Sequence, residues 1–279
     1  MRMSYPVPLD QLTAGFLSSC SYTDFVGAIN QWNVPPGSYD TLSRWRVFGD
    51  VTTASRLFEV ACTTGFSCRE MARATGCTAE GIDISALSVR LATYNAARHG
   101  AGGDTSYICG DALTHPALQK YTHVVVGAAA RFFPEPMKLI DTCTDLLDDG
   151  GAILASPFYV HQRIPGDLVA RAREVFGITV TNESYAEVFE PYAGLTVRHE
   201  QHITPRQETE AELRHYCDST VQRFAEDAGV DAPDVLEVAH GRLLAIKRMS
   251  NDLRPYQRYA VLVLGFDRAQ YPRRYVELF

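Results

Sequence analysis

The middle of the chain alternates between short apolar runs and segments in which apolar residues recur every three or four positions. Short apolar runs are typical of buried strands, whereas the longer spacing indicates amphipathic helices. Strands that alternate with helices in this way predict βαβ units and therefore a mostly parallel sheet. We expect strands at 56–61, 79–85, 106–111, 123–129 and 151–160, and helices at 67–75, 86–100, 134–147 and 166–176.

The segments on either side of this alternating stretch are predicted to be mainly helical. Apolar residues at helical spacing precede it, and two long helical patterns separate its end from a final apolar run. The region 185–192 has no clear period and is predicted to be a loop. The additional elements expected are helices at 8–33, 38–49, 208–229 and 234–253 and strands at 194–203 and 259–267.

Charge and composition exclude several classes of protein. The chain has 279 residues and a net charge of −7. It shows no basic stripe of the kind that grips a phosphate backbone, so we expect no nucleic-acid partner. No apolar run approaches the ~20 residues that cross a bilayer, and the start lacks the pattern of a secretory signal. We therefore expect a cytoplasmic protein with no membrane partner.

The seven cysteines stand singly along the chain. None forms a CxxC pair, and an odd number in a chain of this size does not indicate a disulfide framework. A cysteine in an apolar strand usually acts as a small hydrophobic residue. We therefore expect no metal site and no structural disulfides.

The most informative turn follows the first predicted strand, in the sequence Glu59-Val60-Ala61-Cys62-Thr63-Thr64-Gly65. An acidic residue near the strand's end, then small residues, then a helix start is a nucleotide-binding geometry. Small residues let the backbone approach a ligand, and the helix start offers free N–H groups. A dinucleotide would need G-x-G-x-x-G for its pyrophosphate, and here only Gly65 remains.

This turn resembles motif I of the class I S-adenosylmethionine (SAM)-dependent methyltransferases, commonly D/E-x-G-x-G-x-G. Glu59, Ala61, Thr63 and Gly65 stand at its positions and are the expected cofactor-binding residues. Alanine and threonine replace the first two glycines. The branched side chain of Thr63 lies where the methionine part of the cofactor would pass.

Two aspartates follow at the spacing that the resemblance requires. Asp83 ends the second predicted strand, eighteen residues after Gly65, where a carboxylate can take both hydroxyls of a ribose. The resemblance implies that Asp111, at the end of the third strand, binds the adenine amino group while Ala112 packs on the ring. Ile84 completes the expected cofactor set. Either aspartate alone is more often a helix cap, but their order strengthens the interpretation.

The resemblance implies a Rossmann-like α/β sheet of seven strands, one of them antiparallel, with N-terminal helices and a helical lid insert. It also implies SAM as cofactor and S-adenosyl-L-homocysteine as product. The expected segments are an N-terminal helical lid at 1–50, a SAM-binding core at 51–205, a helical insert at 206–255 and a last strand at 256–279.

The acceptor is expected beyond the carboxyl ends of the strands. Methyl transfer is an in-line displacement that needs alignment and, for many acceptors, a base. His161 is the first candidate base, although a solvated loop histidine would look the same, and Glu187 or Glu190 is the next. The aromatic residues expected to contact the acceptor, each of which could instead be packing, are Tyr22, Phe25, Phe132, Phe133, Phe158 and Tyr159.

The sequence thus favours a SAM-dependent methyltransferase acting on a small-molecule acceptor, by C-, N- or O-methylation of an aromatic or apolar secondary metabolite. The Asn/Asp-Pro-Pro-Tyr/Phe signature of nucleic-acid N-methyltransferases is missing after the fourth predicted strand. Two alternatives stay open. Thr63 is compatible with an inactive SAM-fold binding protein, and a Rossmann oxidoreductase would need the missing glycines. The sequence also leaves open whether the chain forms a homo-oligomer.

Overall fold

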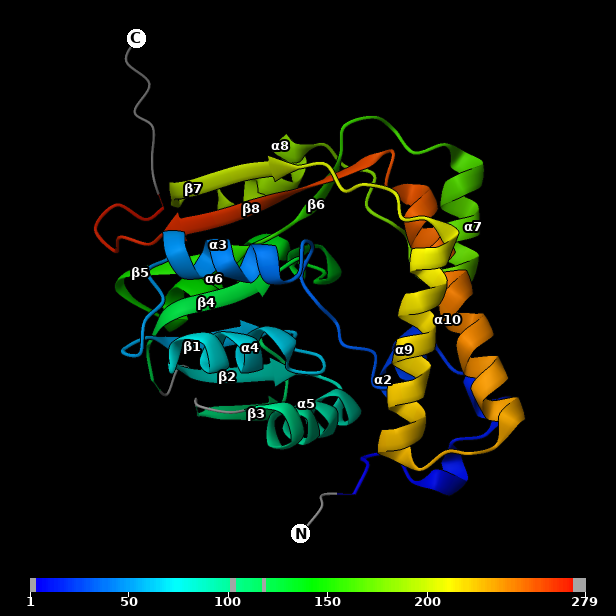
Figure 1. Ribbon diagram of the computed structural model, residues 1–279. Coiled ribbons are helices and arrows are strands. Elements are labelled where there is room, and N and C mark those ends of the chain that lie inside the picture. Colours follow the sequence, from blue (N-terminus) through cyan, green and yellow to red (C-terminus); the bar gives the residue numbers. More distant parts are fainter. Residues whose placement is uncertain (1–3, 101–103, 117–118, 273–279) are drawn as a thin grey trace.

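A mixed eight-stranded sheet lies at the centre of the molecule (Figure 1). The computed structural model describes residues 4–100, 104–116 and 119–272, so the ends of the predicted segments 1–50 and 256–279 lie partly outside the described residues. The strands are β1 (Arg56–Val60), β2 (Thr78–Asp83), β3 (Thr105–Cys109), β4 (Tyr121–Gly127), β5 (Leu147–Ala155), β6 (Phe158–Val160), β7 (Thr196–Ile203) and β8 (Gln257–Gly265).

The strand order is β3-β2-β1-β4-β5-β8, with β6 and β7 also paired to β8. Among the described strands, β8 alone runs against its neighbours. The predicted strand 151–160 is split into β5 and β6, but both halves pair with β8 in one continuous register, through Ala155↔Leu262 and Phe158↔Tyr259. Pro157, between them, has no N–H for the ladder. The predicted fold class is confirmed, and there are eight strands rather than seven because the predicted strand 151–160 is divided into β5 and β6.

Helices cover both faces of the sheet because the central strands are apolar on both sides. In β8, Leu262 and Leu264 point to one face while Val261 and Val263 point to the other. Helices α3 and α4 cover the second of these faces, and α6, α8 and η3 cover the first. These elements and their neighbours are α3 (Tyr39–Phe48), α4 (Phe66–Thr75), α5 (Ala86–His99), η2 (Ala130–Phe132), α6 (Pro136–Leu146), α8 (Tyr185–Phe189) and η3 (Glu190–Tyr192).

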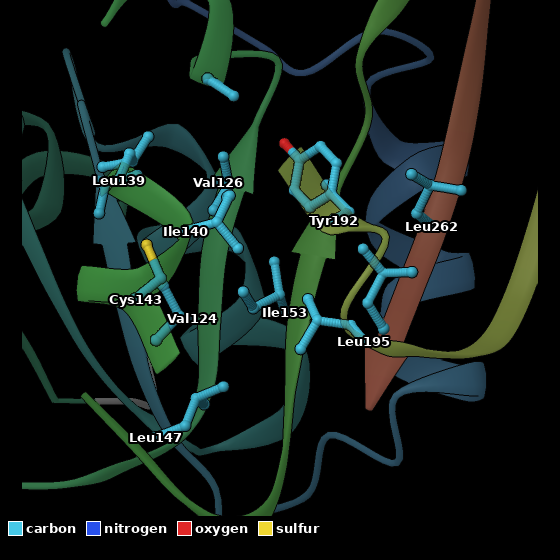
Figure 2. Packing of buried hydrophobic residues seen from close by; sticks show 14 of the residues in the cluster. Val124, Val126, Leu139, Ile140, Cys143, Leu147, Ile153, Tyr192, Leu195 and Leu262 are labelled. Atoms are coloured by element: carbon cyan, nitrogen blue, oxygen red, sulfur yellow. The ribbon is translucent and has the colours of Figure 1, made fainter. Parts of the chain in front are cut away.

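The layer between the sheet and α6 is mainly apolar. Figure 2 shows Leu139 and Ile140 of α6 beside Val124 and Val126 of β4, with Ile153 of β5 next to them. All five side chains are buried. Packing of this kind fixes the carboxyl ends of β4 and β5, which border the candidate site.

A second group of helices, which we call the helical cap, stands beside the end of the sheet to which β4 points (Figure 1). Its helices surround an apolar cluster of their own that includes Phe25, Phe224 and Leu243. The helix at 210–228 has strong end signals, since Thr209 and Glu212 form a capping box before it and Gly229 closes it. The cap consists of α1 (Ala14–Ser19), α2 (Tyr22–Ala28), α7 (Gly166–Phe176), α9 (Glu210–Ala228) and α10 (Pro233–Leu253), preceded by η1 (Leu9–Gln11).

Two predicted elements are wrong in detail. The helix expected over 8–33 is interrupted, because the side chains of Thr13 and Ser21 each accept a backbone N–H and start new helices, α1 and α2. The loop expected over 185–192 contains α8 and η3. A capping box between Ser184 and Glu187 starts α8. Within the described part of the chain, no helix combines the length and apolar character that crossing a membrane requires.

Candidate functional site

The turn after β1 has the backbone of a glycine-rich loop although it contains one glycine. Ala61, Thr63 and Gly65 have φ angles of 51°, 48° and 73°. This left-handed region is favourable for glycine and uncommon for other residues. The Thr63 N–H donates to Oδ2 of Asp83 at 2.9 Å. The two substitutions in motif I therefore leave the shape of the turn intact.

Gly65 is the position in this turn where a side chain has no room. A Cβ atom there would lie 2.7 Å from the ring of Tyr107. The Tyr107 hydroxyl donates to the Gly65 carbonyl at 3.2 Å. Close approach and positive φ together explain why this glycine is kept while the other two are replaced.

Glu59 ties the end of β1 to the start of α4. Its side chain is buried, and its Oε2 accepts the backbone N–H of Cys68 at 3.1 Å. Burial raises the pKa of the Glu59 carboxyl to about 7, although hydrogen bonds from Ser67 and Cys68 oppose the shift. The Glu59 carboxyl thus fixes the end of β1 to the first turn of α4, on either side of the turn at 61–65.

Asp83 presents a prepared carboxylate at the end of β2. It is 8% exposed, and its two oxygens accept the backbone N–H groups of Thr63 and of Ser85, at 2.9 and 2.8 Å. A carboxylate oxygen has about two acceptor positions, so each oxygen keeps one for a ribose hydroxyl. Ile84, beside it, is 79% exposed and offers apolar surface to an aromatic base.

Asp111 lies just beyond β3, next to the β2 end. One of its oxygens accepts the N–H of Leu113 at 2.9 Å, and the side chain is exposed. Ala112 is buried in the main core. Since β1, β2 and β3 are neighbours, their carboxyl ends bring the turn at 61–65, Asp83 and Asp111 to one edge of the sheet. This arrangement fits the adenosine part of SAM.

A buried amide pair supports the turn from the other side. Asn30 and Asn95 exchange hydrogen bonds of 2.8 and 2.9 Å, and Asn95 also donates to the Thr64 carbonyl at 3.2 Å. The Thr64 hydroxyl accepts the backbone N–H of Asn33 at 3.2 Å. This network is not predictable from the sequence, because the two asparagines are 65 positions apart and no local pattern signals their pairing.

The predicted acceptor-contacting residues divide into exposed and buried ones. Phe132 is 70% exposed and Phe158 is 36% exposed, whereas Phe133 is half-buried against the main core. Tyr159 is buried, and its hydroxyl lies 2.7 Å from Nδ1 of His202. Phe158 and Tyr159 point to opposite faces because strand side chains alternate, so they do not line one wall together.

The two aromatic residues predicted in the N-terminal helices pack inside the cap. Tyr22 is half-buried and lies edge-on to Phe176 of α7, with ring centroids 5.7 Å apart. Phe25 is fully buried, and the guanidinium of Arg242 lies 4.5 Å from its ring centroid. In this arrangement the Phe25 side chain serves to pack the cap.

The three candidate bases differ in how their side chains are engaged. The Glu187 carboxylate accepts both the N–H and the hydroxyl of Ser184, at 2.7 Å each, and these bonds lower its pKa. A lower pKa makes it a weaker base. Glu190 is exposed at the start of η3. His161 is exposed just after β6, and its ring has no hydrogen-bond partner among the described residues.

Comparison with known proteins identifies the turn and the strands around it. The family described as "Methyltransferase domain" matches residues 57–151, which run from β1 to β5. Residues 57–151 therefore match a methyltransferase domain. The resemblance predicted from motif I is therefore confirmed for this part of the chain.

Two curated relatives are both ubiquinone biosynthesis O-methyltransferases. The protein from Ralstonia nicotianae is 27% identical over 115 residues, which are 41% of this chain and 47% of the relative. The chain thus matches about half the length of that relative. The protein from Cupriavidus pinatubonensis is 22% identical over 197 residues, which are 71% of this chain and 68% of the relative.

Solved structures share the fold beyond the methyltransferase domain. The MccD protein is 25% identical, with a TM-score of 0.69, and the alignment covers 85% of this chain and all of MccD. A SAM-dependent methyltransferase from Geobacter sulfurreducens, solved with S-adenosyl-L-homocysteine, is 19% identical with a TM-score of 0.62. That alignment covers 86% of this chain and 96% of the other. Both alignments include most of the sheet and helices described above.

Proposed function

We propose that the chain is a SAM-dependent methyltransferase that transfers a methyl group to a hydroxyl oxygen of a small-molecule acceptor. The observation that carries the proposal is the left-handed turn at 61–65, hydrogen-bonded through Thr63 to Asp83. The turn keeps the shape that motif I requires, although two of its glycines are replaced. Oxygen is favoured because both curated relatives are O-methyltransferases.

Each cofactor-binding residue has a separate task in this proposal. Asp83 would accept the two ribose hydroxyls, and Asp111 would accept the adenine amino group. Ile84 and Ala112 would contact the faces of the ring. SAM, when bound, supplies an electrophilic methyl group on its sulfonium. The remaining tasks, aligning the acceptor oxygen and removing its proton, belong to this chain.

His161 is the base that we propose for the acceptor hydroxyl. Its imidazole is exposed just beyond β6, at the carboxyl end of the sheet. His161 would accept the proton of the acceptor hydroxyl as that oxygen takes the methyl group, and SAM would supply the methyl and leave as S-adenosyl-L-homocysteine. Exposed Phe132 and Phe158 would hold the acceptor in line. The net charge of −7 favours a small molecule over a polynucleotide.

The cofactor assignment is tested with Asp83→Ala. Loss of hydrogen bonds to a charged group should weaken S-adenosyl-L-homocysteine binding by roughly 1.5–3 kcal/mol in calorimetry. Asp148→Ala is the matched control, because Asp148 is an exposed strand carboxylate that pairs with Arg56. Equal affinities for the two variants would remove Asp83 from the site.

The reaction itself is tested by measuring S-adenosyl-L-homocysteine release from SAM with a panel of phenols and catechols. His161→Ala should lower kcat by about 10²–10⁴-fold, the usual contribution of a general base. It should leave the affinity for S-adenosyl-L-homocysteine unchanged. Cofactor binding without methyl transfer to any of the panel would favour the inactive binding protein.

A further inference from the structure

A cluster of cationic and aromatic side chains lies at the junction between the helical cap and the sheet. Trp32, on the connection between α2 and α3, is at its centre. The guanidinium carbons of Arg69 on α4 and Arg223 on α9 each lie 4.6 Å from the centroid of the Trp32 ring. The His99 ring meets the same indole edge-on at 5.2 Å.

The cluster contains several buried N–H groups without acceptors. The buried donors without a hydrogen-bond partner among the described residues are Nε1 of Trp32, both terminal nitrogens of Arg69 and Nε of Arg223. Nε2 of His99 is also buried without a partner among these residues, and it donates or accepts depending on the tautomer of the ring. Arg69 is 1% exposed as a whole. Leaving one such group unpaired is unfavourable for folding, and more so when the group is charged. So many donors in one place indicate that they share an acceptor.

The carboxylates near Arg69 do not balance the positive charge of the cluster. Glu70 accepts from Nε of Arg69 at 3.0 Å, but the same carboxylate lies 2.7 Å from a terminal nitrogen of Arg73. One negative charge is thus divided between two guanidiniums.

The charge on α9 is also incompletely paired. Asp227 pairs with Arg98 at 2.7 Å. Arg223 has no carboxylate within salt-bridge distance among the described residues, and donates only to the Asn30 carbonyl at 2.9 Å. Burial lowers the pKa of Arg223, and the nearby Asp227 carboxylate, whose Oδ2 is itself buried without a hydrogen-bond partner among the described residues, opposes this shift. A cation without a partner in such a place favours a bound anion.

The cluster is separated from the ribose side of the cofactor site by the turn at 61–65. Thr63 turns its N–H toward Asp83, whereas the carbonyl of Thr64 is bound to Asn95 of α5 and its hydroxyl to Asn33 of the connection between α2 and α3. The Trp32 ring packs on Phe66, with centroids 6.2 Å apart, just beyond the turn. The two groups of side chains therefore lie on opposite sides of the turn.

We propose that Trp32, Arg69, His99 and Arg223 form a binding site for a compact oxyanion, a carboxylate or a phosphate, distinct from the cofactor's site. Guanidinium groups bind these anions in a bidentate way, and the indole N–H adds a donor. Trp32 and Arg223 come from the cap side, whereas Arg69 and His99 come from α4 and α5. A bound anion therefore links the cap to the sheet. The anion is either free in solution or part of the acceptor.

The test titrates inorganic phosphate and, separately, benzoate into the protein, with sodium chloride at matched ionic strength as reference. Binding is followed by calorimetry and thermal unfolding, with and without saturating S-adenosyl-L-homocysteine. Saturable binding of phosphate supports a site for a free anion, and preferential binding of benzoate supports a carboxylate on an aromatic acceptor. The arms without cofactor do not depend on methyl transfer, so the site and the proposed function can fail separately.

Arg223→Gln should raise the dissociation constant of the anion at least tenfold. Arg242→Gln is the matched control, because Arg242 is another arginine stacked on an aromatic ring, but its donors are satisfied by the carbonyls of Leu17 and Cys20. Trp32→Phe keeps an aromatic ring but removes the indole N–H donor. It should weaken anion binding severalfold in a folded protein. Two results would overturn the proposal: binding no stronger than that of chloride, or displacement of phosphate by S-adenosyl-L-homocysteine.

Discussion

Thr63 holds a backbone conformation that a branched side chain disfavours, with φ at 48°. A left-handed residue costs roughly 1–2 kcal/mol, which glycine avoids, although glycine gives back about 0.5–1 kcal/mol through the entropy of the unfolded chain. We expect Thr63→Gly to raise the free energy of unfolding in urea by about 0.5–1 kcal/mol. Thr105→Gly, in the extended strand β3, should lower it by about the same amount. If the free energy of unfolding falls in both variants, the Thr63 side chain makes a contact that compensates for its backbone conformation.

Glu59 makes the stability of the protein depend on pH. Its pKa rises from 4.5 to about 7 on folding. Between these values the folded chain holds a proton that the unfolded chain has released. The free energy of unfolding therefore falls as pH rises through this window, and the loss is complete above pH 7.

Glu59→Gln isolates this contribution, because an amide does not titrate and its oxygen can still accept the Cys68 N–H. We expect the variant to gain about 3 kcal/mol relative to the native chain between pH 4.5 and pH 8, as 1.36 kcal/mol per pKa unit implies. Urea unfolding of both proteins across this range measures the difference. A constant difference would show that Glu59 is ionised in the folded protein throughout.

At the scale of elements, the amide pair of Asn30 and Asn95 joins the cap connection to α5 and to the turn at 61–65. Asn95→Ala leaves the Thr64 carbonyl and the Asn30 amide without their partner. We expect a loss of about 2–6 kcal/mol in the free energy of unfolding, from two buried groups at about 1–3 kcal/mol each. The Michaelis constant for the acceptor should rise as the cap loosens.

Asn33→Ala is the control for this variant, because Asn33 reaches Thr64 through its backbone N–H, which alanine also has. It should unfold within about 0.5 kcal/mol of the native protein. If the two variants behave alike, the buried amides do not link the cap to the turn.

Local signals explain which elements the sequence predicts well. The alternating core is correct because its central strands are apolar on both faces and its helices have their own period, as in β4 and α4. The break within 8–33 depends on Thr13 and Ser21, whose hydroxyls cap helices only when the chain turns there. The capping box that starts α8 lies in a stretch without a clear hydrophobic period, so the sequence predicts a loop there.

The candidate site divides in the same way. The residues that follow strands, such as Asp83 and Asp111, are predictable because the carboxyl ends of neighbouring parallel strands meet at one edge. The residues on the acceptor side are not predictable, because Phe25 and Tyr159 have the same local sequence pattern whether they line a pocket or pack in a core. Their burial is set by α10 and β7, which are distant in sequence.

For the molecule as a whole, net charge and local charge differ in sign. The chain carries −7, yet Arg69 and Arg223 gather where the cap meets the sheet. An acidic surface with buried cations suits a small anionic group better than a long polyanion, because a polyanion must approach the whole surface. The cap and the sheet thus share polar contacts through both the amide pair and the Trp32 cluster.

This shared interface predicts that cap and sheet unfold together, and the two tryptophans allow a direct test. Trp32 lies at the junction, whereas Trp45 of α3 is fully buried against the sheet and donates to the Ala155 carbonyl. In Trp45→Phe the fluorescence reports on the junction, and in Trp32→Phe it reports on the sheet. We expect each reporter to follow the same transition as the circular dichroism of its own variant.

Ligands then distinguish the three functions considered for the chain. S-adenosyl-L-homocysteine at about 100 times its dissociation constant should add about 2.7 kcal/mol to the unfolding transition seen by either tryptophan, because binding only to the folded chain stabilises all of it. NAD at the same concentration should add nothing, since the turn at 61–65 lacks the glycines that a pyrophosphate needs. Stabilisation by NAD alone would favour the oxidoreductase. A shift seen by Trp45 but not by Trp32 would show that the cap unfolds independently of the cofactor site, and it would then act as a lid that closes only on the acceptor.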